Sequence, residues 1–248
     1  MPNLPAHMDL AKQVAQRLDC DVVEANMGCY LLGSTSPDIR IITRKTREEY
    51  HFTTLDFKNV GAGVQGLFEA HPGLQAANGH SGPTQAFVAG YITHLIADEV
   101  WISRMFRPFF GNRDVFEDET YGLVLDRAMQ LELDRQSWDS ADSLKSSLAT
   151  STSAIDIGFI ESHQLTEWAL WIISFMDRGF TWERLRFMAR RIASGDETHP
   201  AFRMVDEFVA DVPQGMERLE ELVPVDNLDG YKRQVLDGLV DAVGDYLS

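Results

Sequence analysis

The stretch that decides the fold is TQAFVAGYITHLIADEVWI, residues 84–102. When these residues are placed on a helix, apolar side chains cover almost its whole circumference, and a helix of that kind lies buried among others. The stretch therefore predicts one central helix around which the rest of the chain packs.

The sequence on both sides of this stretch has few alternating β-branched runs and is largely helical in its periodicity. Residues 39–57 are the exception, and we expect a loop there because a lone strand would have no partner. Further helices are expected at 7–18, 27–32, 115–135, 163–177, 182–193, 200–210 and 227–246. The prediction is an all-α, multi-helix single domain over 1–248, with candidate site motifs in 1–110 and a helical part in 111–248.

The charge of the chain restricts its partners. It carries 22 basic and 38 acidic side chains, so its formal charge is 22 − 38 = −16. This excess repels polyanions, so neither a nucleic-acid polymer nor an anionic membrane is an expected partner. No apolar run reaches the ~18 residues of a membrane span, and the residues after Met1 lack a secretory signal. We therefore expect a cytoplasmic protein without stable membrane insertion.

His94 and Asp98 are polar residues within the apolar stretch. Their spacing of four places them one above the other on one helix face. An ionised carboxylate in apolar surroundings costs too much free energy unless it is paired or bound to a metal. Two interpretations are open: Asp98 bonds to His94 or to an arginine and fixes helix packing, or both side chains bind a metal ion.

Three further residues favour the metal. His7 lies near the start of the first expected helix, Asp38 closes a Gly-Ser-Thr-Ser-Pro-Asp loop, and His51 lies between two aromatic residues. Each alone is more often a structural residue. Together they form an ordered pattern: LPAH (4–7), LLGSxxPD (31–38), HF (51–52) and FVxGYxTHLxxD (87–98). This pattern resembles the zinc-dependent phospholipase C family, a mostly α-helical relative of bacterial phospholipase C and of P1-type nucleases.

The resemblance implies a helical bundle of the phospholipase C and P1-nuclease type with a two-part metal site. In that site Asp38, His51, His94 and Asp98 would hold one ion, and His7 with a bridging Asp98 would hold a second. Zinc suits these ligands, and iron or manganese is an alternative.

The implied activity is hydrolysis of a phosphate ester, with a metal-activated water attacking phosphorus and Asp38 and Asp98 as the catalytic carboxylates. Its substrate would be a small phosphate ester or a dispersed phospholipid. The other interpretation is a non-catalytic helical module that binds metal or a partner and uses the same residues to hold its fold together. The oligomeric state is not predicted.

The pattern also departs from the family. A mature N-terminal Trp ligand has no counterpart, and the His-xxx-Glu pair expected soon after Asp98 is absent there. The pair His163 and Glu167 comes much later; it either joins the site or forms a solvated helix face, and the second interpretation is favoured. We therefore expect one or two metal ions rather than three. Arg104 and Arg107 are candidates for gripping the phosphate, although covering the edge of the core is the more common role.

Residues 61–66, GAGVQG, spell the GxGxxG pattern of dinucleotide sites. Such a site also requires a helix of normal length and a second strand bearing an acidic residue about 20 positions further on. Neither feature is present in the sequence. We therefore discount a dinucleotide site.

Overall fold

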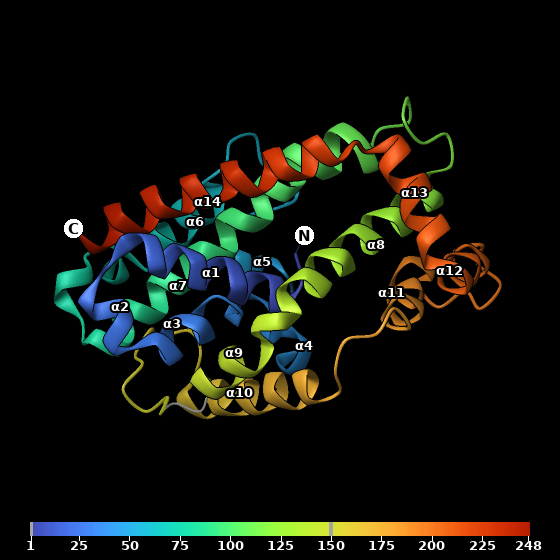
Figure 1. Ribbon diagram of the computed structural model, residues 1–248. Helices are drawn as coiled ribbons and strands as arrows, with labels where there is room; N and C mark the ends of the chain where they lie inside the picture. The colour runs from blue at the N-terminus through green and yellow to red at the C-terminus, as the bar shows by residue number, and fades with distance from the viewer. Residues whose placement is uncertain (1, 149–150) are drawn as a thin grey trace.

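The computed structural model describes residues 2–148 and 151–248, and all regular structure in these ranges is helical, which confirms the all-α prediction (Figure 1). The longest helices are α1 (Leu4–Leu18), α7 (Gly82–Trp101), α8 (Glu119–Ser137), α10 (Ser162–Asp177) and α14 (Val225–Leu247). The other elements, in chain order, are α2 (Asp21–Ala25), α3 (Met27–Gly33), η1 (Ser36–Ile39), α4 (Arg40–Thr43), α5 (Glu48–His51), α6 (Ala62–Ala70), η2 (Pro72–Leu74), η3 (Ala77–Gly79), the π-helix η4 (Ile102–Phe110), η5 (Trp138–Ser140), α9 (Ala141–Ser147), α11 (Arg184–Ala193), α12 (Ala201–Ala210) and α13 (Val212–Leu222).

The central helix is α7, as the apolar stretch predicts. Every residue from Ala86 to Trp101 is buried, and α3 and α14 pack along the helix, with α1 and α2 beside them (Figure 1). Two glycines permit the close approach of α3. A Cβ atom on Gly90 would lie 1.9 Å from the Tyr30 carbonyl oxygen, and one on Gly33 would lie 2.0 Å from the Phe87 carbonyl oxygen. The backbones of α3 and α7 are therefore in direct contact.

The expectation of a loop over residues 39–57 is wrong in part. The chain there ends the turn η1 and forms the short helices α4 and α5. Pro37 lies in the first turn of η1, where its fixed φ suits a helical turn. Ile39 and Tyr50 are buried, so tertiary contacts stabilise helical turns that are too short to be stable alone.

Two other boundaries differ from the sequence prediction for a local reason. The helix expected from residue 115 begins at Glu119, because the side chain of Asp118 accepts hydrogen bonds from the backbone N–H groups of Thr120 and Tyr121. Helix α13 is not among the predicted helices. It begins after Asp211, whose side chain accepts a hydrogen bond from the Gln214 N–H. In both places a capping aspartate sets the first turn.

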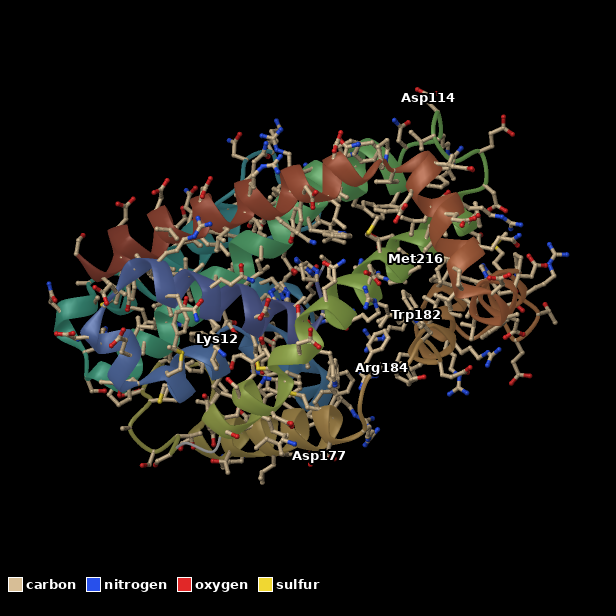
Figure 2. The ribbon with its side chains drawn as sticks, in the orientation of Figure 1. Lys12, Asp114, Asp177, Trp182, Arg184 and Met216 are labelled. Atoms are coloured by element: carbon tan, nitrogen blue, oxygen red, sulfur yellow. The ribbon has the colours of Figure 1, made fainter. Side chains whose placement is uncertain are left out.

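The connection from α10 to α11 is held by Arg184, which is labelled with Trp182 in Figure 2. The Arg184 guanidinium donates hydrogen bonds to the carbonyl oxygens of Phe175 and Gly179 and lies 4.1 Å from the centroid of the Phe175 ring. Helix α11 packs against α8. One hydrophobic cluster runs from Leu4 to Tyr246, and the single domain over 1–248 stays a prediction.

None of the helices within residues 2–148 and 151–248 combines the length and the apolar character that a bilayer crossing requires.

Candidate metal centre

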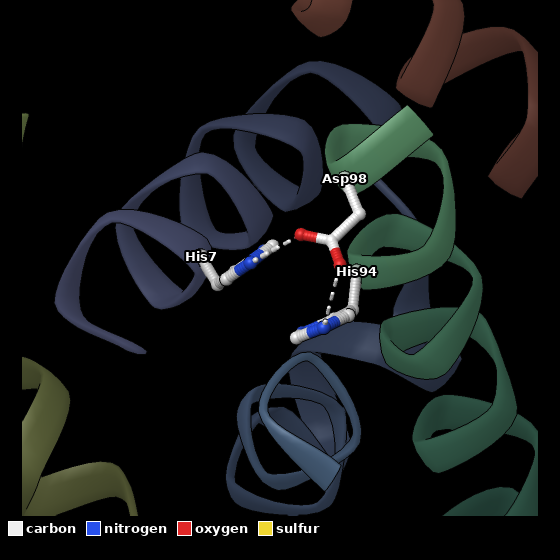
Figure 3. A group of neighbouring side chains, drawn as sticks. All are labelled: His7, His94 and Asp98. Atoms are coloured by element: carbon white, nitrogen blue, oxygen red, sulfur yellow. Dashed lines mark ion pairs between the residues drawn. The ribbon is translucent and has the colours of Figure 1, made fainter. Parts of the chain in front are cut away.

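Four helical elements bring five polar side chains to one place beside α7. The side chains are His7 from α1, Asp38 from η1, His51 from α5, and His94 and Asp98 from α7. Ligand atoms of His7, His94 and Asp98 lie within 4.8 Å of one another, and so do those of Asp38, His51 and His94. Figure 3 shows the first of these two groups. All five candidate ligands from the sequence are therefore neighbours in space.

The Asp98 carboxylate lies at the middle of the cluster. Its Oδ1 is 3.3 Å from Nε2 of His7, and its Oδ2 is 3.7 Å from Nε2 of His94 (Figure 3). The same Oδ2 lies 3.2 Å from Nε2 of His51. The two oxygens thus point to different histidines. This arrangement suits a carboxylate that bridges two ligand groups.

The hydrogen bonds of two imidazole rings define their tautomers. Nδ1 of His94 lies 2.9 Å from the Ser34 carbonyl oxygen, and Nδ1 of His51 lies 3.2 Å from the Arg47 carbonyl oxygen. A carbonyl oxygen only accepts, so these contacts favour the tautomer with the proton on Nδ1 and a lone pair on Nε2, although Nε2 of His51 also lies 3.2 Å from Oδ2 of Asp98. These two Nε2 atoms lie 3.4 Å apart. Two lone pairs at that separation need a proton or a cation between them, which is the arrangement of metal-binding histidines.

Two buried atoms of the cluster, Nε2 of His7 and Oδ1 of Asp98, face each other at 3.3 Å but lack the geometry of a hydrogen bond to each other or to another described residue. Leaving a buried polar atom unpaired costs about 1–3 kcal/mol, so an ion between the two atoms would remove that cost. The ring of His7 also stacks on that of His94, with centroids 3.8 Å apart. Imidazole nitrogens and carboxylate oxygens are a ligand set that zinc accepts, so the residues present fit a metal ion.

The charges of the cluster also suit a metal. Burial, and to a smaller extent the neighbouring His7, lower the pKa of His94 to about 3, although the charge of Asp98 opposes the shift. Burial by itself raises the pKa of Asp98, but His94, His51 and His7 together bring it well below its usual range. At neutral pH the histidine is therefore neutral and the aspartate ionised, which are the forms that coordinate metals.

Arg47 also belongs to the cluster, although no pattern in the sequence distinguishes it. Its Nη2 lies 3.3 Å from Oδ2 of Asp98, and its side chain is 11% exposed. It precedes His51 by four residues and therefore shares a helical face with it, but nearby Arg44 and Lys45 look equally suitable in the sequence. One of the two interpretations from the sequence pairs Asp98 with an arginine. That ion pair is present together with the histidine cluster.

The glycine-rich segment 61–66 binds the carboxylate of Glu99. The backbone N–H groups of Gly61 and Gly63 donate to the buried Glu99 side chain over 2.5 and 2.6 Å. A Cβ atom on Gly63 would lie 2.8 Å from the His51 carbonyl oxygen. Glu99 therefore fastens the segment after His51 to α7, and it is a second supporting residue without a distinct signal in the sequence.

His163 and Glu167 are exposed on α10, away from both ligand groups. The His163 side chain is 70% exposed and pairs with Glu161, with Nδ1 and Oε2 3.1 Å apart. Helix α10 turns Leu165, Trp168 and Ile172 toward the core, so this pair points to solvent. This placement agrees with the favoured interpretation of the pair as a solvated helix face. No contact among the described residues brings His163 or Glu167 to the cluster as a further metal ligand.

The two arginines proposed for the phosphate are placed differently. Arg104 is exposed on η4. Arg107 donates two hydrogen bonds from Nη2, to the carbonyl oxygens of Leu55 at 2.8 Å and Phe57 at 2.7 Å, and stacks over the Phe57 ring. Nη2 of its guanidinium is thus bonded to the chain after α5, and the role of Arg104 and Arg107 as substrate contacts stays a prediction.

Comparison with known proteins agrees with this geometry. Residues 6–105 match the family model described as zinc dependent phospholipase C, which confirms the resemblance over this part of the chain. The match is shorter than half of the 248 residues and contains all five clustered side chains. The comparisons with curated proteins and with solved structures gave no match.

Proposed function

We propose that this protein is a metal-dependent hydrolase of phosphate esters similar to zinc-dependent phospholipase C. The observation that carries the proposal is the pair of facing Nε2 atoms on His51 and His94, 3.4 Å apart, with the ionised Asp98 beside them. The match over residues 6–105 supports a metal-dependent hydrolase at the level of the family. The substrate and the reaction are the further step that we propose.

We assign Asp38, His51, His94 and Asp98 to one zinc ion, and His7 with the shared Asp98 to a second; iron or manganese would suit the same atoms. A bound dication supplies activation of a water and stabilisation of charge on the phosphoryl oxygens. The carbonyl groups of Ser34 and Arg47 hold the rings of His94 and His51 in the tautomer that this requires. Arg47 orients the Asp98 carboxylate.

The two carboxylates have different roles because their exposure differs. The Asp98 side chain is 2% exposed and is enclosed by histidines and Arg47, so it acts as a fixed anion. The Asp38 side chain is 22% exposed, so it is the carboxylate of the two that water reaches more easily. During hydrolysis the water oxygen bonds to phosphorus, the ester P–O bond breaks, and Asp38 accepts the proton that the water loses, which passes to the leaving alkoxide.

The negative charge of the chain and the family match together indicate the physical form of the substrate. A chain with a formal charge of −16 is repelled by an anionic bilayer or a nucleic-acid polymer. We therefore propose a small phosphate ester, or a phospholipid dispersed from the bilayer, as the substrate.

A second function is a non-catalytic module whose metal holds the helices together. The observation in its favour is the burial of the three histidines and Asp98, whose side chains are at most 2% exposed. Such a site joins α1, α5 and α7 whether or not a substrate can reach it.

One experiment separates the two functions. Purified protein is analysed for bound metals and then assayed on phosphate monoesters and diesters, with and without a chelator. Hydrolysis that chelator abolishes and zinc restores supports the enzyme. Bound metal that raises the melting temperature, without hydrolysis of any ester, supports the structural module. His51→Gln should lose the metal, and the exposed His163→Gln serves as the matched control that should keep it.

A further inference from the structure

A cavity of about 250 Å³ lies between α1, α8 and α14. Helix α1 packs against both other helices, and side chains from all three line the cavity. The described residues that line it do not include any of the five side chains of the metal cluster. The volume exceeds the ~150 Å³ of an apolar cavity that holds a benzene molecule. A small molecule therefore fits this space outside the metal cluster.

The inner wall of the cavity is apolar. Leu133 on α8 and Tyr231 and Leu236 on α14 are buried, and the half-buried Leu10 on α1 adds a fourth large apolar side chain. Apolar walls with a few polar groups are typical of sites for small organic molecules. This wall therefore suits a hydrocarbon chain or ring.

The charged side chains that line the cavity are mostly basic. They are Arg17, Lys232, Arg233 and Asp9, so their formal charge is 3 − 1 = +2 in a chain of −16. Helix α14 carries five aspartates and two basic residues, and only the two basic residues line the cavity. The cavity is thus a place that attracts an anion on a protein whose net charge repels anions.

Two of these three cations have no carboxylate partner. Lys232 donates from Nζ to the amide oxygen of Gln136 over 2.6 Å and forms no ion pair with any described residue. Arg233 is exposed and has neither a hydrogen bond nor an ion pair within the described part of the chain. Arg17, by contrast, pairs with Asp237, with Nη1 and Oδ1 2.8 Å apart. Lys232 and Arg233 therefore keep charged N–H donors for an oxyanion.

We propose that this cavity binds a small amphiphilic anion. The apolar chain of the anion lies against Leu10, Leu133 and Leu236, and Lys232 and Arg233 hold its carboxylate or phosphate group. Both head groups offer the oxygens that the paired N–H donors of a guanidinium match. The proposal is independent of the proposed function, because no residue of the metal cluster takes part.

The first test compares ligands by calorimetry on the full-length, chelator-treated protein at constant ionic strength. Octanoate and octyl phosphate should bind, and whichever binds more tightly identifies the head group. The cation octylamine should not bind, and butanoate should bind at least about tenfold more weakly than octanoate because it buries less hydrocarbon. Equal affinity for octanoate and octylamine, or no binding of either octyl anion, would overturn the proposal.

The second test uses variants of the basic residues. Arg233→Gln and Lys232→Gln should each weaken octanoate binding about tenfold, the effect of losing one charge-assisted hydrogen bond. Because the exposed Arg233 makes no polar contact with the described residues, its replacement should leave the melting temperature of the free protein unchanged.

Lys12→Gln is the matched control. Lys12, labelled in Figure 2, lies on α1, donates to Ser143 and does not line the cavity, so this variant should retain the wild-type affinity. Equal losses in Arg233→Gln and Lys12→Gln would reveal a general charge effect and overturn the proposal. Octanoate binding that requires added zinc would place the anion at the metal cluster and would also overturn it.

Discussion

Nε2 of His51 and Nε2 of His94 face each other across 3.4 Å while Nδ1 of each ring is bonded to a backbone carbonyl. The carbonyl group that faces His51 belongs to Arg47, a near neighbour in the sequence. The one that faces His94 belongs to Ser34, in a distant segment of the chain. The backbone therefore presets both rings for a shared cation before any ligand binds.

Replacing Asp98 by asparagine should abolish metal binding. The substitution keeps the size of the side chain but removes the charge that faces His7, His51 and Arg47. Elemental analysis should find less than about a tenth of the wild-type metal, since a dication favours an anionic carboxylate over a neutral amide. Glu167→Ala on the exposed face of α10 is the control and should retain its metal; loss of metal there would refute the surface placement of the pair.

Replacing Glu99 by glutamine should weaken the metal site indirectly. Glutamine retains one acceptor but presents an amide N–H₂ to one of the donors of Gly61 and Gly63. We expect a loss of about 1–3 kcal/mol in the free energy of unfolding, and about a tenfold loss of zinc affinity through the adjacent His51 segment. Chemical denaturation and competition with a chelator measure the two effects. Unchanged zinc affinity with lower stability would restrict Glu99 to a role in folding.

The contact between α3 and α7 predicts a severe effect of a single methyl group. Gly90→Ala should destabilise the protein by several kcal/mol, because the new Cβ would overlap the Tyr30 carbonyl oxygen at 1.9 Å. Gly238→Ala in α14 is the matched helical control, since nothing lies within 4 Å of its Cβ position. That variant should gain about 0.5–1 kcal/mol from helix propensity. Similar unfolding free energies for the two variants would contradict the close contact.

Asp134 on α8 predicts a pH dependence of stability. Burial raises its pKa to about 7, although a hydrogen bond from Asn3 opposes the shift. The pKa of Asp134 is higher in the folded state than in the unfolded state, so the folded state binds more protons between the two values. This group therefore makes the protein less stable as pH rises from about 4 to about 7. Asp134→Asn removes the titration. Its free energy of unfolding relative to wild type should therefore be higher at pH 8 than at pH 5. The same difference from wild type at both pH values would show that Asp134 is already ionised in the folded protein at pH 5.

Much of the fold and of the site is local in the sequence. The apolar circumference of residues 84–102 determines a buried helix, and the spacing of His94 and Asp98 determines that they share one of its faces. The family pattern adds His7, Asp38 and His51, and these residues lie beside the pair. Their role as metal ligands stays a prediction.

Only the tertiary structure decides which distant groups complete the site. Arg47 reaches Asp98 across 51 positions of the chain, and Gly61 reaches Glu99 across 38. Periodicity reports which face of a helix is buried, because side chains three and four residues apart share a face. Periodicity does not show which faces of separate helices meet, because that depends on how all the helices pack together. The charged neighbours of this site are therefore determined by packing.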